Sequence, residues 1–261
     1  MIFDTHAHYN DEKFDSDRSE LLSSMPSHGI GLIMNACSSL DEAKDIIEMC
    51  EKYPFIYGAI GIHPEAVNTA ADGYLDEIKK YVSHPKIKAI GEIGLDYYWT
   101  TDTKSEQQRL LCEQVELARE LNMPVIIHDR EAHGDCLRLL RQSKVYECGG
   151  VFHCYSGSAE MVREITEDLG MYIAFGGSLT FKNAVKPREA AKAVPLDKLL
   201  IETDSPYLAP VPYRGKRNSS IYLPNVLNVL SETLSVPADE LERITYENGK
   251  RLFSIDEVDN A

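Results

Sequence analysis

Eight short apolar segments recur along the 261-residue chain, and they constrain its fold more than any other feature. They read MIFD, IGLIMNA, FIYGAIGI, IKAIGEIGL, PVIIH, GGVFHC, MYIAFG and LLIET. Apolar residues run continuously through them, which is typical of parallel strands that are covered on both faces. The sequence therefore predicts eight buried parallel strands.

Helical patterns separate these segments. In SSLDEAKDIIEMCEKY, apolar residues repeat with helical spacing from Ala43 to Cys50. Ser39 and Glu42 offer a capping box at the start of this helix. Eight strand–helix units in about 250 residues fit a closed (β/α)8 TIM-type barrel, which is an α/β fold. We therefore predict that residues 1–261 form one barrel domain, with the irregular stretch APVPYRGKRNSS after the eighth strand.

The composition excludes several classes of protein. Lysine and arginine number 27 against 42 aspartate and glutamate residues, a net charge of −15, which argues against a broadly basic surface that wraps nucleic acid. No apolar run approaches the ~20 residues that span a bilayer, and the N-terminus does not resemble a secretory signal. We therefore expect a cytoplasmic monomer with no membrane association and no obligate protein partner.

Polar residues gather where the predicted strands end. Five of the eight histidines lie at these positions, together with two carboxylates. In a (β/α)8 barrel the carboxyl ends of the strands form one ring, and active sites of this fold lie on that face. In strand order, the residues at the predicted ends are His6 and His8, Asn35, His63, Glu92, His128, His153, Gly176 to Ser178, and Asp204.

Six of these residues are strong metal ligands, which is more than one tetrahedral ion uses. Imidazoles mixed with carboxylates suit zinc or manganese, whereas magnesium usually takes more oxygen ligands. Two divalent ions that share one carboxylate, about 3.5–4 Å apart, would activate water for hydrolysis of esters, phosphoesters or amides. We predict two ions (Mg, Mn or Zn) held by His6, His8, Glu92, His128, His153 and Asp204.

Two further polar residues have alternative interpretations. Glu202 lies two positions before Asp204, so it either orients a ligand or a water molecule, or is a salt-bridged residue of the barrel. His63 either contacts the phosphate or leaving group of a substrate, or is a loop residue beside Pro64 without a function.

Two segments near the predicted site could contact an anionic or aromatic substrate. Arg214, Lys216 and Arg217 in RGKRN form the densest basic cluster, which either binds phosphate or, for Lys216 and Arg217, is a solvated loop. Trp99, the only tryptophan, lies in DYYWTT shortly after Glu92. Its aromatic stretch either stacks on bases or packs as part of a lid.

Six motifs in this order and spacing resemble the TatD-type metal-dependent deoxyribonucleases of the amidohydrolase-like barrel superfamily. They are DTHAH, GEIGLDYY, VIIHDREAH, FHCYSG, IETDSPYLAP and RGKRN, and the match extends from Phe3 to ITYENGKRLF near the C-terminus. The resemblance implies a TIM-type barrel with divalent metal ions and phosphodiesterase activity on DNA, often as a 3′-to-5′ exonuclease. RNA stays open as a substrate.

The resemblance also implies roles for individual residues. It places one ion on His6, His8, Glu92 and Asp204, and a second on Glu92, His128 and His153. Asp204 would also be the base that takes the proton of the attacking water, so Asp204 and the shared Glu92 are the catalytic pair. His63 and Arg214 would lie near the substrate.

The chain departs from the family pattern at two places. Tyr9-Asn10 stands where the family usually has an apolar residue and aspartate, and Ser219-Ser220 stands where it usually has Glu-Pro. No predicted metal ligand is lost, but the second departure bears on how the basic loop is anchored and on substrate preference.

Two other functions are compatible with the same residues. One is a barrel amidohydrolase or lactonase acting on a small cyclic amide or ester. Such sites often use a carboxylated lysine at the end of strand four, where this chain has Glu92. The other is a metal-binding scaffold without catalysis, although loss of activity should have removed some of the six ligands.

Overall fold

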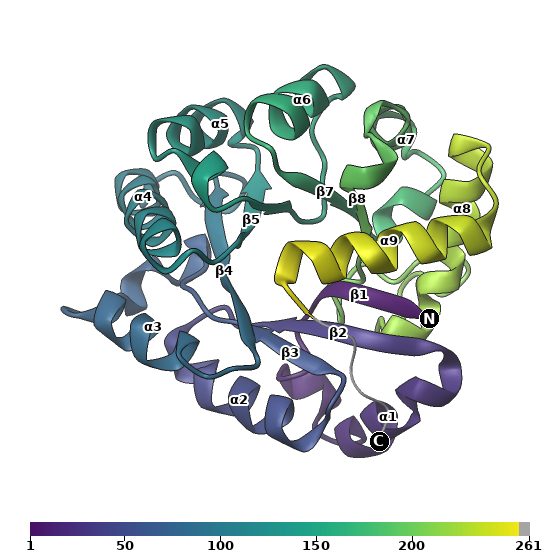
Figure 1. Cartoon of the computed structure of the whole chain (residues 1–261), viewed down its shortest axis with the longest axis horizontal. Coiled ribbons are helices and arrows are strands. Elements are labelled where there is room, and N and C mark those ends of the chain that lie inside the picture. The colour runs from purple at the N-terminus through teal and green to yellow at the C-terminus, as the bar shows by residue number, and fades with distance from the viewer. Residues whose placement is uncertain (256–261) are drawn as a thin grey trace.

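The computed structural model describes residues 1–255, in which eight parallel strands form a nearly closed barrel surrounded by helices (Figure 1). The strands pair in chain order, and a parallel bridge from Ala7 to Ser205 joins the first strand to the segment after the last. The predicted (β/α)8 barrel is confirmed. The strands are β1 Ile2–Ala7, β2 Ile30–Ala36, β3 Ile56–Ala59, β4 Ile87–Asp96, β5 Val125–Arg130, β6 Gly150–Phe152, β7 Tyr172–Phe175 and β8 Leu199–Ile201.

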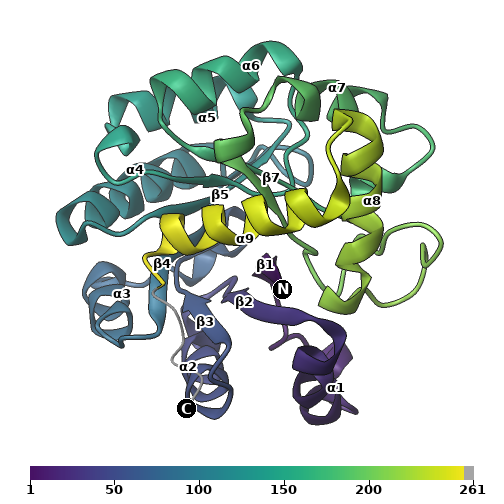
Figure 2. The same cartoon turned by 45° about the vertical axis from the view of Figure 1, so that its right-hand side comes forward.

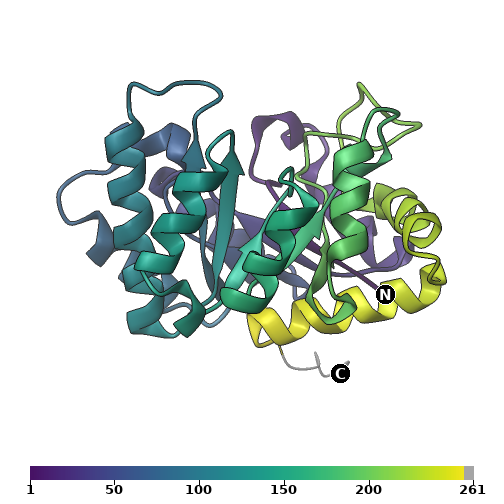
Figure 3. The same cartoon turned by 90° about the horizontal axis from the view of Figure 1, so that it is seen from above.

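Helices connect successive strands on the outside of the barrel, and the last helix crosses one of its ends (Figures 2 and 3). No helix within residues 1–255 is long and apolar enough to cross a membrane. The helices are α1 Arg18–Ser24, α2 Ala43–Lys52, α3 Tyr74–Val82, α4 Lys104–Leu121, α5 His133–Gln142, α6 Ala159–Arg163, α7 Val185–Ala193, α8 Leu223–Leu234 and α9 Ala238–Phe253.

The apolar residues of the strands form two separate layers. In β2, Leu32 and Met34 belong to the core inside the barrel, whereas Ile33 packs between the barrel and the helices. Neighbouring residues of a strand point to opposite faces, so both faces must be apolar when both are covered. This double burial explains the continuous apolar runs in the sequence.

Helix α9 closes the end of the barrel that lies opposite the loops after the strands (Figure 3). Phe253 of α9 joins the inner core and packs against Phe3 of β1, with the ring centroids 5.9 Å apart. A Cβ at Gly249 would lie 2.5 Å from the Phe3 ring, so a glycine is needed for this close approach. The polar residues lie at the other end of the barrel.

Strand β4 extends beyond the end predicted for it. Glu92 lies within β4, which continues to Asp96 because its last residues pair with β5 as far as Asp96 and Arg130. Gly94 makes this pairing possible, since a Cβ there would collide with the carbonyl oxygen of His128. The prediction that the strand ends at Glu92 was therefore wrong. β8, in contrast, ends at Ile201, so Asp204 lies in the segment that follows the strand.

The predicted capping box is also wrong in detail. Residues Leu40–Glu42 form a short 3-10 turn, and α2 begins only at Ala43. The side chain of Ser39 makes no capping hydrogen bond. The Glu42 carboxylate instead accepts hydrogen bonds from the amide of Ser38, at 2.9 Å, and from the side chain of Asn10, at 2.8 Å.

Candidate metal centre

The predicted ligands except His6, which is fully buried, line one cavity at the carboxyl ends of the strands. This main cavity has a volume of about 560 Å³, and a side cavity of about 300 Å³ adjoins it. A hollow of similar size, about 570 Å³, lies between α1 and α2 but contains none of the predicted ligands, so volume alone does not identify a site. The two adjoining cavities share His128, Arg130, His153, Asp204 and Leu208.

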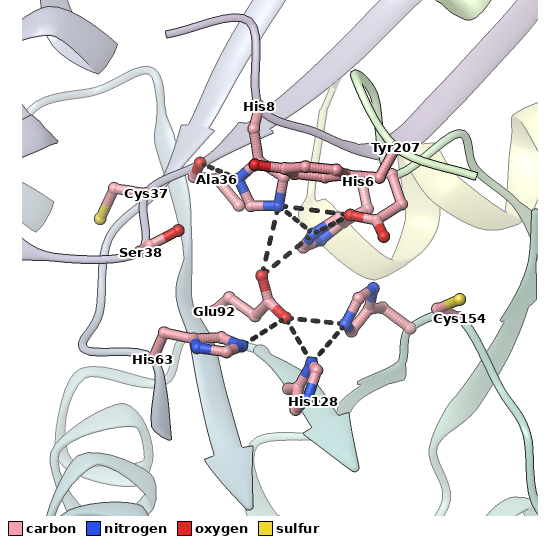
Figure 4. A network of polar contacts seen from close by, with 12 residues as sticks. His6, His8, Ala36, Cys37, Ser38, His63, Glu92, His128, Cys154 and Tyr207 are labelled. Carbon is pink, nitrogen blue, oxygen red and sulfur yellow. Dashed lines mark hydrogen bonds and ion pairs between the residues drawn. The ribbon is translucent and has the colours of Figure 1, made fainter. Parts of the chain in front are cut away.

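Three donors gather on one side of Glu92, and we call His6, His8 and Asp204 the first donor set. His6 lies in β1, His8 directly follows it, and Asp204 lies in the segment after β8. Glu92 Oε2 lies 3.2 Å from Nε2 of His6 and 3.4 Å from Nε2 of His8 (Figure 4). Asp204 Oδ1 lies 3.8 and 3.4 Å from the same two nitrogens. The two histidines of DTHAH thus converge on one point, as their spacing predicts.

Three histidines gather on the other side of Glu92, and we call His63, His128 and His153 the second donor set. Glu92 Oε1 lies 2.9 Å from Nδ1 of His128, 2.8 Å from Nε2 of His153 and 3.3 Å from Nε2 of His63. Figure 4 shows His63 and His128 reaching this oxygen from below while His6 and His8 lie above. Each oxygen of Glu92 therefore faces its own set of imidazoles.

The donor set fits metal ions better than it fits hydrogen bonds alone. Nε2 of His6 lies 3.0 Å from Nε2 of His8, and Nδ1 of His128 lies 3.2 Å from Nε2 of His153. Ligands about 2.0–2.2 Å from a tetrahedral ion lie roughly 3.3–3.6 Å from one another, close to these separations. Three groups of donors in the described residues could hold an ion: His6, His8 and Glu92; His63, Glu92 and His128; and His6, His153 and Asp204.

Backbone contacts orient the first donor set. The carbonyl oxygen of Ala36 lies 2.9 Å from Nδ1 of His8, which places a proton on Nδ1 and makes Nε2 the nitrogen that faces a cation. The amide of Asp204 donates to the carbonyl of His6 at 3.0 Å, and the amide of His8 donates to the carbonyl of Ser205 at 2.7 Å. Asp204 has a φ of 56°, a strained conformation that is imposed where the barrel closes.

Carboxylates orient the second donor set. Asp96 Oδ2 lies 2.9 Å from Nε2 of His128, and Glu202 Oε1 lies 3.5 Å from Nδ1 of His153. Carboxylates that hold the far nitrogen of a ligating histidine raise its basicity and fix its ring. Glu202 Oε1 accepts a hydrogen bond from the amide of Cys154 at 2.6 Å, and Nδ1 of His153 makes no hydrogen bond, so an orienting role for Glu202 stays a prediction.

Asp96 was missed by sequence reasoning. Glu92 and Asp96 lie four residues apart in β4, so their side chains point to the same face of the strand. The aspartate of GEIGLD was therefore a usable signal, and it went unused because the strand was expected to end at Glu92.

The charges of the centre hold its carboxylates ionised. Burial would raise the pKa of Glu92, but His153, His63 and His6 outweigh it and hold that pKa well below its usual range. Burial would lower the pKa of His8, yet Asp204 and Glu92 raise it to about 10. At neutral pH Glu92 is thus in the ionised form that a metal ligand requires.

His63 lines the main cavity and has two polar contacts. Its Nδ1 accepts a hydrogen bond from the amide of Glu65 at 3.1 Å and so caps the turn that follows β3. Its Nε2 faces Glu92 as part of the second donor set. A contact between His63 and a substrate stays a prediction.

Two arginines of the basic loop RGKRN have different contacts. Arg217 donates two hydrogen bonds to Asp17, at 2.8 and 2.6 Å, so it anchors the loop to the start of α1. Arg214 is exposed, with its guanidinium 4.2 Å above the ring of Phe181, and it is not among the residues that line the main or side cavity. Its role near the substrate stays a prediction.

The two departures from the family pattern contact each other. The hydroxyl of Tyr9 lies 2.7 Å from Oγ of Ser220 and accepts a hydrogen bond from the Ser220 amide at 2.9 Å. Ser220 in turn donates to the buried Asp4 at 2.6 Å. Tyr9 and Ser220 therefore secure the end of the basic loop against β1, where the family usually has other residues.

Comparison with known proteins points to the same family as the six sequence motifs. A family model described as TatD related DNase matches residues 3–254. The uncharacterized metal-dependent hydrolase YabD of Bacillus subtilis is 42% identical over 255 residues, which cover 98% of this chain and 100% of that protein. The uncharacterized metal-dependent hydrolase YcfH of Escherichia coli K12 is 36% identical over 259 residues, with coverage of 98% and 97%.

Solved structures agree on the fold. The crystal structure of YJJV, a TatD homolog from Escherichia coli K12, superposes with a TM-score of 0.91 at 31% identity and covers 98% of both chains. A hydrolase of the TatD family from Entamoeba histolytica superposes with a TM-score of 0.86 at 23% identity, covering 97% of each chain. The resemblance inferred from the six motifs is confirmed.

Proposed function

Because the chain belongs to the TatD-related DNase family and is a metal-dependent hydrolase, we propose that it hydrolyses phosphodiester bonds of DNA with two divalent ions, as a 3′-to-5′ exonuclease. The observation that carries the proposal is the position of Glu92, whose Oε2 faces His6 and whose Oε1 faces His128. One carboxylate between two sets of imidazoles is the arrangement that a bridged pair of ions uses.

The charge of the centre suits an anionic substrate better with metal present. Two divalent ions, when bound, supply Lewis-acid activation of water and offset the charge of a phosphodiester. Without them, Glu92 and Asp204 would repel phosphate in a chain whose net charge is −15. Phosphoryl transfer of this kind depends mainly on positioning and charge stabilisation, which fixed side chains provide.

Asp204 is the residue we propose as general base. Its side chain is 17% exposed, lines both cavities and keeps Oδ1 3.4 Å from Nε2 of His8. The neighbouring histidines overcome the effect of burial and lower the pKa of Asp204, so it is ionised and able to accept a proton from water. Every proposed ligand comes from one chain, which is why we propose that a monomer is active.

An assay with labelled oligonucleotides tests the proposal. The chain, supplied in turn with Mg²⁺, Mn²⁺ and Zn²⁺, is given 5′- and 3′-labelled single- and double-stranded DNA, the matching RNA, and a panel of lactones and cyclic amides. We expect early release of the 3′-terminal label from DNA, and loss of activity on chelation. Turnover of lactones or amides alone would replace the proposal with a barrel amidohydrolase, and full nuclease activity without metal would refute the mechanism.

A further inference from the structure

Two exposed aromatic rings lie at the edge of the metal centre. Trp99 is 62% exposed and Tyr98 is 54% exposed, and their rings meet edge to face with centroids 4.9 Å apart. Trp99 lines the main cavity together with His63 and His128. Large apolar rings that face water beside a polar site are available to a ligand.

Arg130 adds an unpaired positive charge to these rings. Its guanidinium lies 3.8 Å from the centroid of Tyr98 and 5.3 Å from that of Trp99. It lines both the main and the side cavity, and within residues 1–255 no carboxylate forms an ion pair with it. In an acidic chain, such an arginine beside a metal centre suits an anion such as phosphate.

One buried carboxylate joins the aromatic turn to the metal centre. Asp96 Oδ1 accepts hydrogen bonds from the amides of Tyr98, at 2.9 Å, and Trp99, at 3.2 Å. Its other oxygen, Oδ2, lies 2.9 Å from Nε2 of His128. The rings therefore have a position fixed relative to the second donor set.

We propose that Tyr98, Trp99 and Arg130 form a subsite for one unpaired nucleotide, and we call these three residues the aromatic rim. The base stacks on Trp99, and Arg130 holds a phosphate oxygen next to the bond that is cut. The inference rests on the proposed function and adds to it the side chains that hold the terminal nucleotide. In a duplex the flanking base pairs occupy the faces of the base, so a frayed or single-stranded end is the form that fits.

Tryptophan fluorescence tests the stacking without any cleavage. Trp99 is the only tryptophan, so the whole signal comes from the rim. The metal-loaded chain is titrated with a phosphorothioate-linked thymidine octamer, an abasic chain of the same length, and a blunt duplex. Strong quenching by the octamer with little by the other two supports the proposal. Equal quenching by the abasic chain, or none by the octamer, overturns it.

Cleavage rates separate the base contact from the phosphate contact. Wild type should cut an oligonucleotide that ends in thymidine faster than one that ends in an abasic nucleotide, by about 10- to 100-fold, the range that base–aromatic stacking supplies. Trp99→Ala should bring this ratio close to 1, and Trp99→Phe should restore part of it. Arg130→Ala should raise KM for both substrates alike, because phosphate is common to them.

Matched variants and one outcome keep this test separate from the proposed function. Tyr146→Ala and Arg163→Ala alter an exposed ring and an exposed arginine outside the rim, and should leave the ratio unchanged. A ratio near 1 in wild type, or a Trp99→Ala variant that keeps the wild-type ratio, overturns the rim. Wild type that cuts neither oligonucleotide overturns the proposed function, and the fluorescence titration then still decides whether Trp99 binds a base.

Discussion

The two donor sets on either side of Glu92 are positioned by different means. The first set comes from the seam of the barrel, where the backbone contacts between β1 and the segment after β8 place His8 and Asp204. The second set comes from β5 and from the segments after β3 and β6, where Asp96 holds His128 and Glu202 lies behind His153. One half depends on closure of the fold, and the other half depends on buried carboxylates.

This difference has a consequence for metal binding. Burial would lower the pKa of His128, but Asp96 and Glu92 outweigh it and raise that pKa above its usual value. A more basic imidazole binds a cation more strongly. We therefore expect the two ions to respond separately to mutation, with Glu92 as the one residue that both of them need.

Glu92→Gln should have the largest effect, because it removes the charge shared by both donor sets. We expect activity on DNA to fall by ~10³-fold or more and both ions to be lost together, as measured by metal analysis after dialysis. Glu240→Gln, an exposed change in α9, is the control. A variant that keeps one tightly bound ion would show that Glu92 is not shared by both donor sets.

Asp204→Asn should cost about 10²- to 10⁴-fold in kcat, the range for loss of a general base. Because the second ion is proposed to rest on Glu92, His128 and His153, that ion should remain. The measurement is single-turnover cleavage with metal analysis in parallel. Wild-type kcat in this variant would remove Asp204 from the chemistry.

Asp96→Asn should weaken binding of the second ion by about 10- to 100-fold, since it removes the carboxylate that holds His128. Excess metal should restore most of the activity, in contrast to Asp204→Asn. Asp135→Asn, which changes a carboxylate paired with Lys104 and Arg138 outside the centre, is the control. If Asp96→Asn weakened both ions equally, the separate control of the second set would be refuted.

The pH should change metal affinity at the first donor set, because His8 must lose a proton to bind an ion. In the metal-free chain its pKa rises from an ordinary value of 6.5 to about 10, so an ion that binds at neutral pH must displace a proton. Affinity should rise about tenfold per pH unit below 10 for one proton released. The raised pKa contributes stability to the metal-free fold below pH 6.5, and this contribution is lost as the pH rises through about 10. Calorimetry in buffers of different ionisation enthalpy counts the protons, and a count of zero contradicts this account.

Tyr9→Phe should have the smallest effect. It removes the hydroxyl that accepts a hydrogen bond from the Ser220 amide, which should lower the free energy of unfolding by about 1–3 kcal/mol. Metal affinity should stay unchanged, because the Tyr9 hydroxyl contacts Ser220 and none of the donors of the first set. Denaturant unfolding and metal titration measure both quantities. Loss of an ion in this variant would mean that the seam network supports the centre directly.

Much of this centre could be predicted from the sequence, because strand ends and two-residue spacing are local features. The spacing of His6 and His8 alone predicted that their rings converge, and the structure brings their nitrogens within 3.0 Å. The partner of Arg217 could not be predicted in this way, since Asp17 lies 200 residues away in the chain. Asp96 was not predicted because β4 was expected to end at Glu92. For the same reason, the link that Asp96 makes between His128 and the aromatic rim was not predicted.

The most direct test of the account is the anomalous scattering of a crystal grown with Mn²⁺. We predict two peaks per chain, one on the side of Glu92 that faces His6 and His8 and the other on the side that faces His128 and His153. A single peak under saturating metal, or two peaks that do not have Glu92 between them, would contradict the bridged pair on which the proposed hydrolysis of DNA depends.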